Sequence, residues 1–293
     1  MQRNEKKNSS YGAKRTTAII ISIIWLILGA VILEWLPLVP AHDSSVPDNN
    51  VTIDATSFFL QQRGGEGGNL RVKDAKPVMI QGAQLLGGEA TSHGGNVSVT
   101  RANIRIEEGT LIDGGHSKGY GGSFRVYQAD VLMTGGEIRG GTCATQVAHN
   151  VWLAGSAAVP ARFYMQGGTV YATPNFNHPG TGIYAFENAK VYLMGDATVI
   201  DGDGATVAGL RASADSRICI VDGWSGSANI RWAEQFASGT TVTAAYGQVV
   251  TLDGSGNETG IGGSFTGKLC QVFDGTLQVV ADTAGNLLLQ QPQ

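Results

Sequence analysis

Three aspartates stand where an enzyme acting on glycans would need carboxylates. Asp113 lies in the segment LIDGG, and Asp201 and Asp203 lie in VIDGDG. Glycosidases cleave with two carboxyl groups about 5 to 9.5 Å apart, one of which supplies a proton. Asp-Gly is also ordinary turn chemistry, since both residues tolerate left-handed backbone. These three are the candidate catalytic residues, and the sequence leaves open whether they only turn the chain.

A second set of residues combines aromatic rings with arginine. Flat rings with a polar rim suit the faces of sugars. The same rings could instead stabilise neighbouring strands, or lie under the C-terminal segment or a second subunit. The candidate ligand-binding residues are Arg125, Trp152, Tyr184, Arg211, Tyr164 and Tyr192.

Metal and disulfide chemistry have little support. His93, His149 and His178 have no carboxylate or thiol at a regular spacing from them, so solvated loop histidines are expected and no metal or cofactor is predicted. The three cysteines, Cys143, Cys219 and Cys270, show neither zinc-binding spacing nor a disulfide framework.

These residues are carried by a repeat. Similar segments recur from Gly67 onward, with matching points at Gly95, Gly122, Asn150, Gly182 and Gly209. The interval between successive points is roughly 27 to 32 residues, which is typical of a solenoid. Each copy contains three short segments in which every second residue is apolar, the pattern of a strand. The sequence therefore predicts an all-β coil of three strands per turn, with equivalent strands stacked in parallel.

The alternation also predicts which side chains point inward. The first strands place Val97/Val99, Phe124/Val126, Val151/Leu153, Ile183/Ala185 and Leu210/Ala212 inside. The second strands place Ile104/Ile106, Val131/Met133, Phe163/Met165, Val191/Leu193 and Ile218/Ile220 inside. The third strands place Leu111, Ile138, Val170 and Val199 inside, with Ile112, Arg139, Tyr171 and Ile200 outside.

The 42 glycines fit this coil, because each turn must round three tight corners. Glycine pairs fall at those corners: Gly94-Gly95, Gly121-Gly122, Gly135-Gly136, Gly140-Gly141 and Gly167-Gly168.

On this repeat, residues 51–222 resemble the right-handed parallel β-helix superfamily of pectate lyases and bacterial surface proteins. The resemblance implies either a non-catalytic, adhesin-like surface protein or a polysaccharide lyase or glycoside hydrolase. Members that are lyases hold calcium with acidic residues and use an arginine base, so calcium is expected only under that alternative. The sequence motifs typical of polygalacturonases are absent.

The N-terminal region predicts export. Residues 18–36 are apolar apart from Glu34 and long enough to cross a bilayer, and five basic residues precede them. We expect a basic tail over residues 1–17, a membrane anchor or uncleaved signal over 18–36 and a polar linker over 37–50. The β-helix over 51–222 would then end in a β-rich cap over 223–293. Val39-Pro40-Ala41 also resembles a signal-peptidase site, so a secreted form stays open.

The net charge of the predicted exported part argues against one class of partner. Residues 42–293 hold 15 basic and 22 acidic residues, a net charge of −7, which argues against nucleic acid. The sequence therefore predicts an exported cell-surface protein that binds a glycan or another surface protein without catalysis. The lyase or hydrolase is the alternative, and self-assembly into a homo-oligomer remains open.

Overall fold

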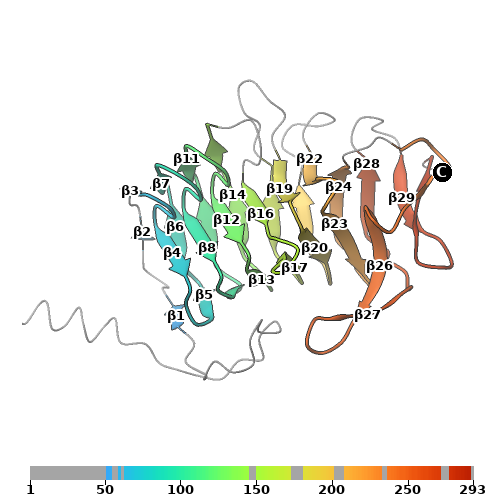
Figure 1. The fold of residues 1–293 in the computed structure, drawn as a ribbon, viewed down its shortest axis with the longest axis horizontal. Coiled ribbons are helices and arrows are strands. Elements are labelled where there is room, and N and C mark those ends of the chain that lie inside the picture. The colour runs from blue at the N-terminus through green and yellow to red at the C-terminus, as the bar shows by residue number, and fades with distance from the viewer. Residues whose placement is uncertain are drawn as a thin grey trace, which may run out of the picture.

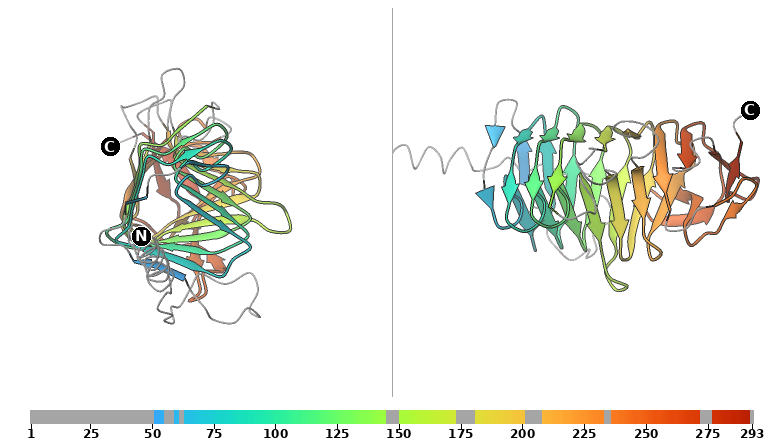
Figure 2. Two further views of the ribbon diagram at one scale, coloured as in Figure 1. Left: turned by 90° about the vertical axis from the view of Figure 1, so that its left-hand side faces the viewer. Right: turned by 90° about the horizontal axis from the view of Figure 1, so that it is seen from above.

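The computed structural model describes residues 51–54, 59–60, 63–144, 150–172, 181–200, 208–232, 236–271 and 277–291. Within these residues the chain forms thirty strands and no helix. The strands wind into a parallel β-solenoid of about six turns, whose coils stack along the long axis of the molecule (Figure 1; Figure 2, right). The all-β solenoid predicted from the repeat is confirmed.

Equivalent strands pair from coil to coil in three long ladders, which we call the first, second and third in chain order. The first ladder holds β4 (Leu70–Lys73), β8 (Val97–Thr100), β12 (Phe124–Tyr127), β16 (Val151–Ala154), β19 (Thr181–Phe186) and β22 (Ala208–Ala212). The second holds β1 (Val51–Asp54), β5 (Val78–Gln81), β9 (Ile104–Ile106), β13 (Asp130–Met133), β17 (Ala161–Met165), β20 (Ala189–Leu193), β23 (Arg217–Val221) and β26 (Gly247–Leu252). The third holds β2 (Phe59–Leu60), β6 (Gln84–Leu86), β10 (Leu111–Asp113), β14 (Glu137–Arg139), β18 (Thr169–Tyr171) and β21 (Thr198–Ile200).

A short fourth ladder closes one corner of the early coils. It consists of β3 (Arg63–Gly64), β7 (Glu89–Ala90), β11 (His116–Ser117) and β15 (Thr142–Cys143).

The observed register confirms the predicted inward residues of the first two ladders. Phe124 pairs with Val97 and with Val151, and Val131 pairs with Ile104 and with Phe163. These side chains are fully buried and form one apolar core along the solenoid axis. Inward-facing residues thus stack on their equivalents one coil away, as parallel pairing requires.

The third ladder needs one correction. Ile112, not Leu111, points inward, because Ile112 pairs with Leu85 and Ile138 and is fully buried. Leu111 pairs with Gln84 and Glu137 and is only half-buried. The order Ile138, Val170 and Val199 holds as predicted.

The repeat is also more regular than predicted at one step. Val151 pairs with Phe124, so Asn150 is equivalent to Ser123 rather than to Gly122. The long step that follows, from Val151 to Ile183, is confirmed by the pairing of these two residues.

In the corner pair Gly94-Gly95, the first glycine is required by its backbone conformation and the second by close packing. Gly94 has a φ of +65°, a backbone conformation that other residues adopt at a cost. Its neighbour Gly95 lies so close to the backbone of Gly122 and His116 that a Cβ atom would collide with them.

A column of buried polar side chains supports the turn before the first ladder. The Asn69 amide donates to Asn96 Oδ1 at 2.6 Å, and Asn96 donates to the carbonyl of Asp113 at 2.9 Å. Buried amides need such partners. The column takes one residue from each coil and consists of Asn69, Asn96, Ser123 and Asn150.

The C-terminal region extends and then ends the ladders. β24 (Ser227–Arg231) pairs in parallel with both β21 and β22, which joins the first and third ladders, and β28 (Lys268–Gln271) pairs in parallel with β24. Antiparallel strands follow: β27 (Glu258–Ile261) on β26, and β29 (Gln278–Ala281) and β30 (Leu287–Gln290) beyond β28, with β25 (Thr241–Val242) on β30. Antiparallel pairing is what ends the parallel repeat here.

The predicted membrane segment, residues 18–36, lies outside the described residues. Among the residues that the structure describes, no helix is long and apolar enough to cross a membrane.

Candidate functional site

The first ladder brings four of the predicted ligand-binding residues into one outward row. Arg125 pairs with Trp152, Trp152 with Tyr184, and Tyr184 with Arg211, each one coil further along. We call these four residues the first-ladder row. Their order follows from the repeat, because residues at equivalent positions of parallel strands stack on the same face.

The rings of this row are stacked rather than open. Trp152 stacks on Tyr120 with ring centroids 4.9 Å apart and planes 12° apart, and Tyr120 stacks on His93 at 5.3 Å. The ring of Phe186 also contacts Trp152, with ring centroids 6.3 Å apart and planes 30° apart. Trp152 is only 6% exposed. The ring faces that a sugar would need are therefore largely occupied by neighbouring rings.

The two arginines of the row differ. Arg125 donates to Ser98 Oγ at 3.3 Å and to Thr100 Oγ1 at 3.0 Å, and burial lowers its pKa. Arg211 is half-buried, with its guanidinium 4.8 Å from the centre of the Tyr184 ring. Arg125 is thus already hydrogen-bonded to protein hydroxyls, whereas Arg211 is held by a cation–π contact.

The second ladder carries the other two predicted residues under a hairpin. Tyr164 and Tyr192 point outward from the sheet and stack at 4.5 Å with planes 7° apart, yet they are 3% and 2% exposed. The β26–β27 hairpin covers them: the Tyr164 hydroxyl donates to the carbonyl of Gly256 at 3.1 Å. Burial raises the pKa of both hydroxyls. Of the alternatives that the sequence left open for these rings, the structure shows cover by the C-terminal segment.

Glu258 fastens the hairpin to the second ladder. Its carboxylate accepts hydrogen bonds from Lys190 Nζ at 2.9 Å, Tyr192 Oη at 2.7 Å and Arg217 Nη2 at 2.6 Å. Burial disfavours the charge, but these three donors outweigh it and lower the pKa of Glu258 to about 2. Cys219 lies beneath, and burial raises the pKa of its thiol to about 12, so it is not a reactive nucleophile.

The carboxylates do not form a catalytic pair among the described residues. Asp113 lies on β10 and accepts a hydrogen bond from Arg139 Nε at 3.0 Å. Asp201 and Asp203 lie outside the described residues, as do His149 and His178. Within the described part of the chain, no group of three His, Cys, Asp or Glu side chains is placed to hold a metal ion.

His93 has a structural partner. Its Nδ1 accepts a hydrogen bond from the backbone N–H of Tyr120 at 2.9 Å, and burial lowers its pKa. The ring is therefore neutral at physiological pH and belongs to the stack on Trp152.

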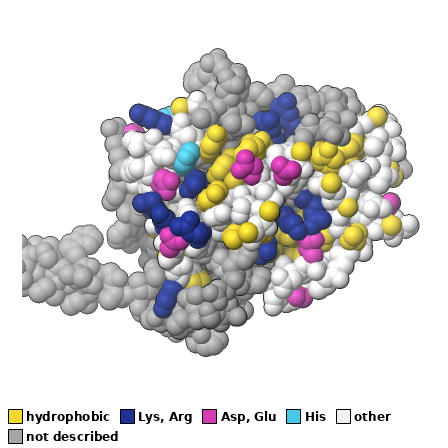
Figure 3. Space-filling view, viewed as in Figure 1, with side chains coloured by type: hydrophobic (Ala, Val, Ile, Leu, Met, Phe, Trp, Pro, Cys, Tyr) yellow, Lys and Arg dark blue, Asp and Glu magenta, His cyan; other side chains and the backbone are white. Residues whose placement is uncertain are grey.

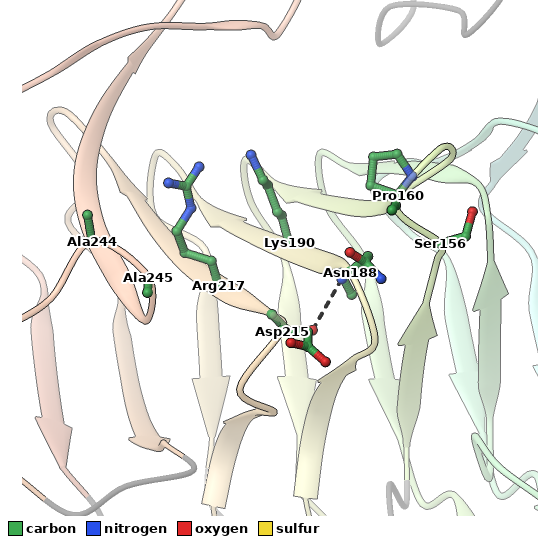
Figure 4. A pocket seen from close by; sticks show the side chains of 11 residues that line it. Ser156, Pro160, Asn188, Lys190, Asp215, Arg217, Ala244 and Ala245 are labelled. Carbon is green, nitrogen blue, oxygen red and sulfur yellow. Dashed lines mark hydrogen bonds between the residues drawn. The ribbon is translucent and has the colours of Figure 1, made fainter.

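A groove that we did not predict lies at the corner between the first and second ladders. Two turns, residues 155–160 and 243–246, stand on either side of the turns at 187–188 and 213–216. The hollow between them has a volume of about 400 Å³ (Figure 4). The side chains that define its polar floor are Ser156, Asn188, Lys190, Asp215 and Arg217.

The irregular step of the repeat creates one wall of this groove. From the first to the second ladder, the chain runs from Tyr127 to Asp130 in one coil but from Ala154 to Arg162 in the next. All of the extra length of the long step therefore lies in the turn at 155–160. This one large deviation from an otherwise regular period is the sequence signal that could have pointed to the site.

Comparison of the chain with protein-family models, with curated proteins and with solved structures returns no match.

Proposed function

We propose that this protein is an exported cell-surface β-helix protein that binds a glycan or another surface protein without catalysing a reaction on it. In this proposal it belongs to the non-catalytic branch of the pectate-lyase-like parallel β-helix superfamily. The observation that supports the proposal is Arg211, a half-buried cation held over the Tyr184 ring at the end of the first-ladder row.

The row favours binding over catalysis. A ladder of paired strands holds its side chains at fixed spacing, so that a ligand would find the groups already ordered and lose little entropy on binding. Arginine and aromatic residues are the types most often found at the centre of binding surfaces. The lyase alternative has less support, because the described candidate Asp113 is held by Arg139 in an exposed ion pair.

Export remains the cellular part of the proposal. It depends on the apolar residues 18–36 and the basic residues before them, which would anchor the chain or direct its secretion. The solenoid would then present its surface outside the cell. On the face shown in Figure 3, basic side chains lie next to acidic ones with hydrophobic side chains between them, a mixture that does not favour nucleic acid.

The test is binding of the full-length protein to a glycan array and to intact cells. Arg211→Gln removes the half-buried cation of the row, and Lys268→Gln on β28 removes an exposed positive charge elsewhere. We expect Arg211→Gln to weaken binding about tenfold, equivalent to about 1.4 kcal/mol, and Lys268→Gln to leave it unchanged. Absence of binding to both array and cells, or equal binding by Arg211→Gln and the unmodified protein, would contradict the proposal.

A further inference from the structure

We infer that the groove at residues 155–160 and 243–246 binds a neutral saccharide. This inference goes beyond the proposed function, because it places a sugar at a second site, separate from the first-ladder row, whatever partner that row binds. It depends on the shape of the groove, the charge of its floor and the unused hydrogen-bonding groups there.

The shape suits a small ring-shaped ligand. A volume of about 400 Å³ falls within the range of small-molecule sites, roughly 300 to 1,000 Å³. The groove spans three coil-to-coil steps, about 14 Å along the axis at the spacing of paired strands. Its floor is fixed by the ladders, since Ala161 pairs with Ala189 and Lys190 pairs with Arg217.

The walls are small and apolar. Ala157 and Pro160 line the side formed by the long turn, and Ala244 and Ala245 line the opposite side (Figure 4). Such side chains leave room for a ring and present carbon atoms to its C–H groups. They offer no large apolar surface, so a hydrophobic ligand would gain little there.

The charges of the floor balance. Lys190 and Arg217 carry positive charge, and both already contact the carboxylate of Glu258. Asp215 adds an exposed negative charge to the floor. An anionic polymer would meet Asp215, and a cationic one would meet Lys190 and Arg217. A ligand without charge avoids both penalties.

The hydrogen-bonding groups are mixed in the way that hydroxyl groups require. Among the described residues, the carboxylate of Asp215 and the side-chain amide of Asn188 make no hydrogen bond with the protein. Ser156 Oγ accepts from the backbone N–H of Val159 at 3.1 Å, which leaves its own proton to donate. A sugar hydroxyl both donates and accepts, so it can use the carboxylate, the amide and the serine together.

The turns that carry these groups are set by the backbone. Asn188 has a φ of +54°, a conformation that asparagine tolerates better than most residues. The backbone N–H of Ala189 donates to Ser216 Oγ at 3.2 Å, which ties the turns at 187–188 and 213–216 together (Figure 4). The floor is thus ordered before a ligand arrives, which lowers the entropic cost of binding.

The experiment blocks the groove without removing any contact of the fold. Ala245 is exposed on the turn at 243–246, so Ala245→Trp should fill the hollow and leave the ladders intact. Ala284→Trp, on an exposed turn outside the groove, is the matched control. Asp215→Ala removes the unused acceptor. The full-length proteins are applied to an array of neutral and uronic-acid oligosaccharides, and the neutral glycan bound most tightly is then titrated by calorimetry.

We expect a neutral oligosaccharide to bind, Ala245→Trp to weaken it at least tenfold, Asp215→Ala to weaken it about fivefold, and Ala284→Trp to bind normally. Binding of uronic-acid glycans alone, of no glycan, or equally by Ala245→Trp would overturn the inference. Arg211→Gln separates the two sites: loss of the neutral glycan with Ala245→Trp but not with Arg211→Gln places that sugar in the groove, and the ligand of the first-ladder row is then the one whose binding Arg211→Gln weakens. The reverse result overturns the groove and leaves the row.

Discussion

The first and second ladders both carry outward-pointing aromatic side chains, but these side chains are covered in different ways. Each stacks aromatic side chains from coil to coil on the outer face of a parallel sheet. On the second ladder, the β26–β27 hairpin lies over Tyr164 and Tyr192 and is bonded to them. On the first ladder, the rings are packed by neighbours such as Tyr120 and Phe186, and Arg211 lies at the end of the row.

This difference shows that a side chain pointing out of a sheet need not be exposed. Hairpin residues from Gly256 to Glu258 lie more than sixty positions after Tyr192 in the chain, and nothing in the repeat itself indicates where they fold back. On the second ladder, the hydroxyl groups of Tyr164 and Tyr192 and the neighbouring cations are bonded to the hairpin. These bonds stabilise the end of the solenoid. The first-ladder row keeps a half-buried cation available for a partner.

The largest expected effect comes from releasing the hairpin. Glu258→Ala would leave Lys190, Arg217 and the Tyr192 hydroxyl without their shared acceptor. Removing one partner of a buried ion pair is strongly destabilising, and because Glu258 is about a quarter exposed we expect a loss of about 3 kcal/mol. Urea unfolding measures the loss, and hydrogen exchange should show β26 and β27 opening first.

The matched control is Glu137→Ala on the third ladder, where the carboxylate pairs with Arg139 in an exposed position. That change should alter the unfolding free energy by less than about 0.5 kcal/mol. Equal effects of the two substitutions would show that the hairpin is not fastened by Glu258.

The second prediction concerns pH, which should act mainly on the second ladder. Burial raises the pKa of Asp130 on β13 to about 6, from an ordinary 3.8, with Arg162 only partly offsetting it. The native state therefore takes up this proton more readily than the unfolded chain, so stability should increase by about 2 kcal/mol as the pH falls from about 7 to about 4.

Glu258 makes the stability depend on pH in the opposite direction. Its pKa of about 2 lies below the ordinary 4.5, so its contribution is complete above about pH 5 and is lost as the pH falls towards 2. Stability should thus be greatest between about pH 4 and 5. Urea midpoints measured from pH 2 to 8 check this, and Asp130→Asn should abolish the rise on the alkaline side while leaving the acid loss. A flat profile for the unmodified protein would refute the assignment.

The smallest expected effect is the loss of stability when one tyrosine hydroxyl is removed from the second ladder or from the first. Tyr164→Phe deletes a buried hydrogen bond to the hairpin, worth about 1 kcal/mol. Tyr184→Phe deletes a hydroxyl that makes no hydrogen bond to the described residues, and should cost less than about 0.5 kcal/mol. Thermal unfolding of the two variants side by side decides the matter, and a larger loss for Tyr184→Phe would reverse the comparison.

Much of the fold could be predicted because the same alternation of apolar residues recurs in several copies of the repeat. Alternation in copies such as Phe124/Val126 and Val131/Met133 fixed the inward face, and parallel stacking then fixed the first-ladder row. The predicted inward residue of the third ladder was wrong at Leu111. Because Leu111 and Ile112 are both apolar, the alternation does not indicate which of them points inward. Only pairing with Ile138 decides that Ile112 points inward.

By itself, the sequence determined the all-β coil, its approximate period and the order of residues along each ladder, because these depend on local alternation and on repetition. Only the tertiary structure decided which outward residues are covered and where the groove lies. The hairpin over Tyr164 and Tyr192 and the two walls around Asp215 bring together segments that are distant in the chain. Their contacts depend on how the coils stack and on where the hairpin and the turns fold, which no single copy of the repeat encodes.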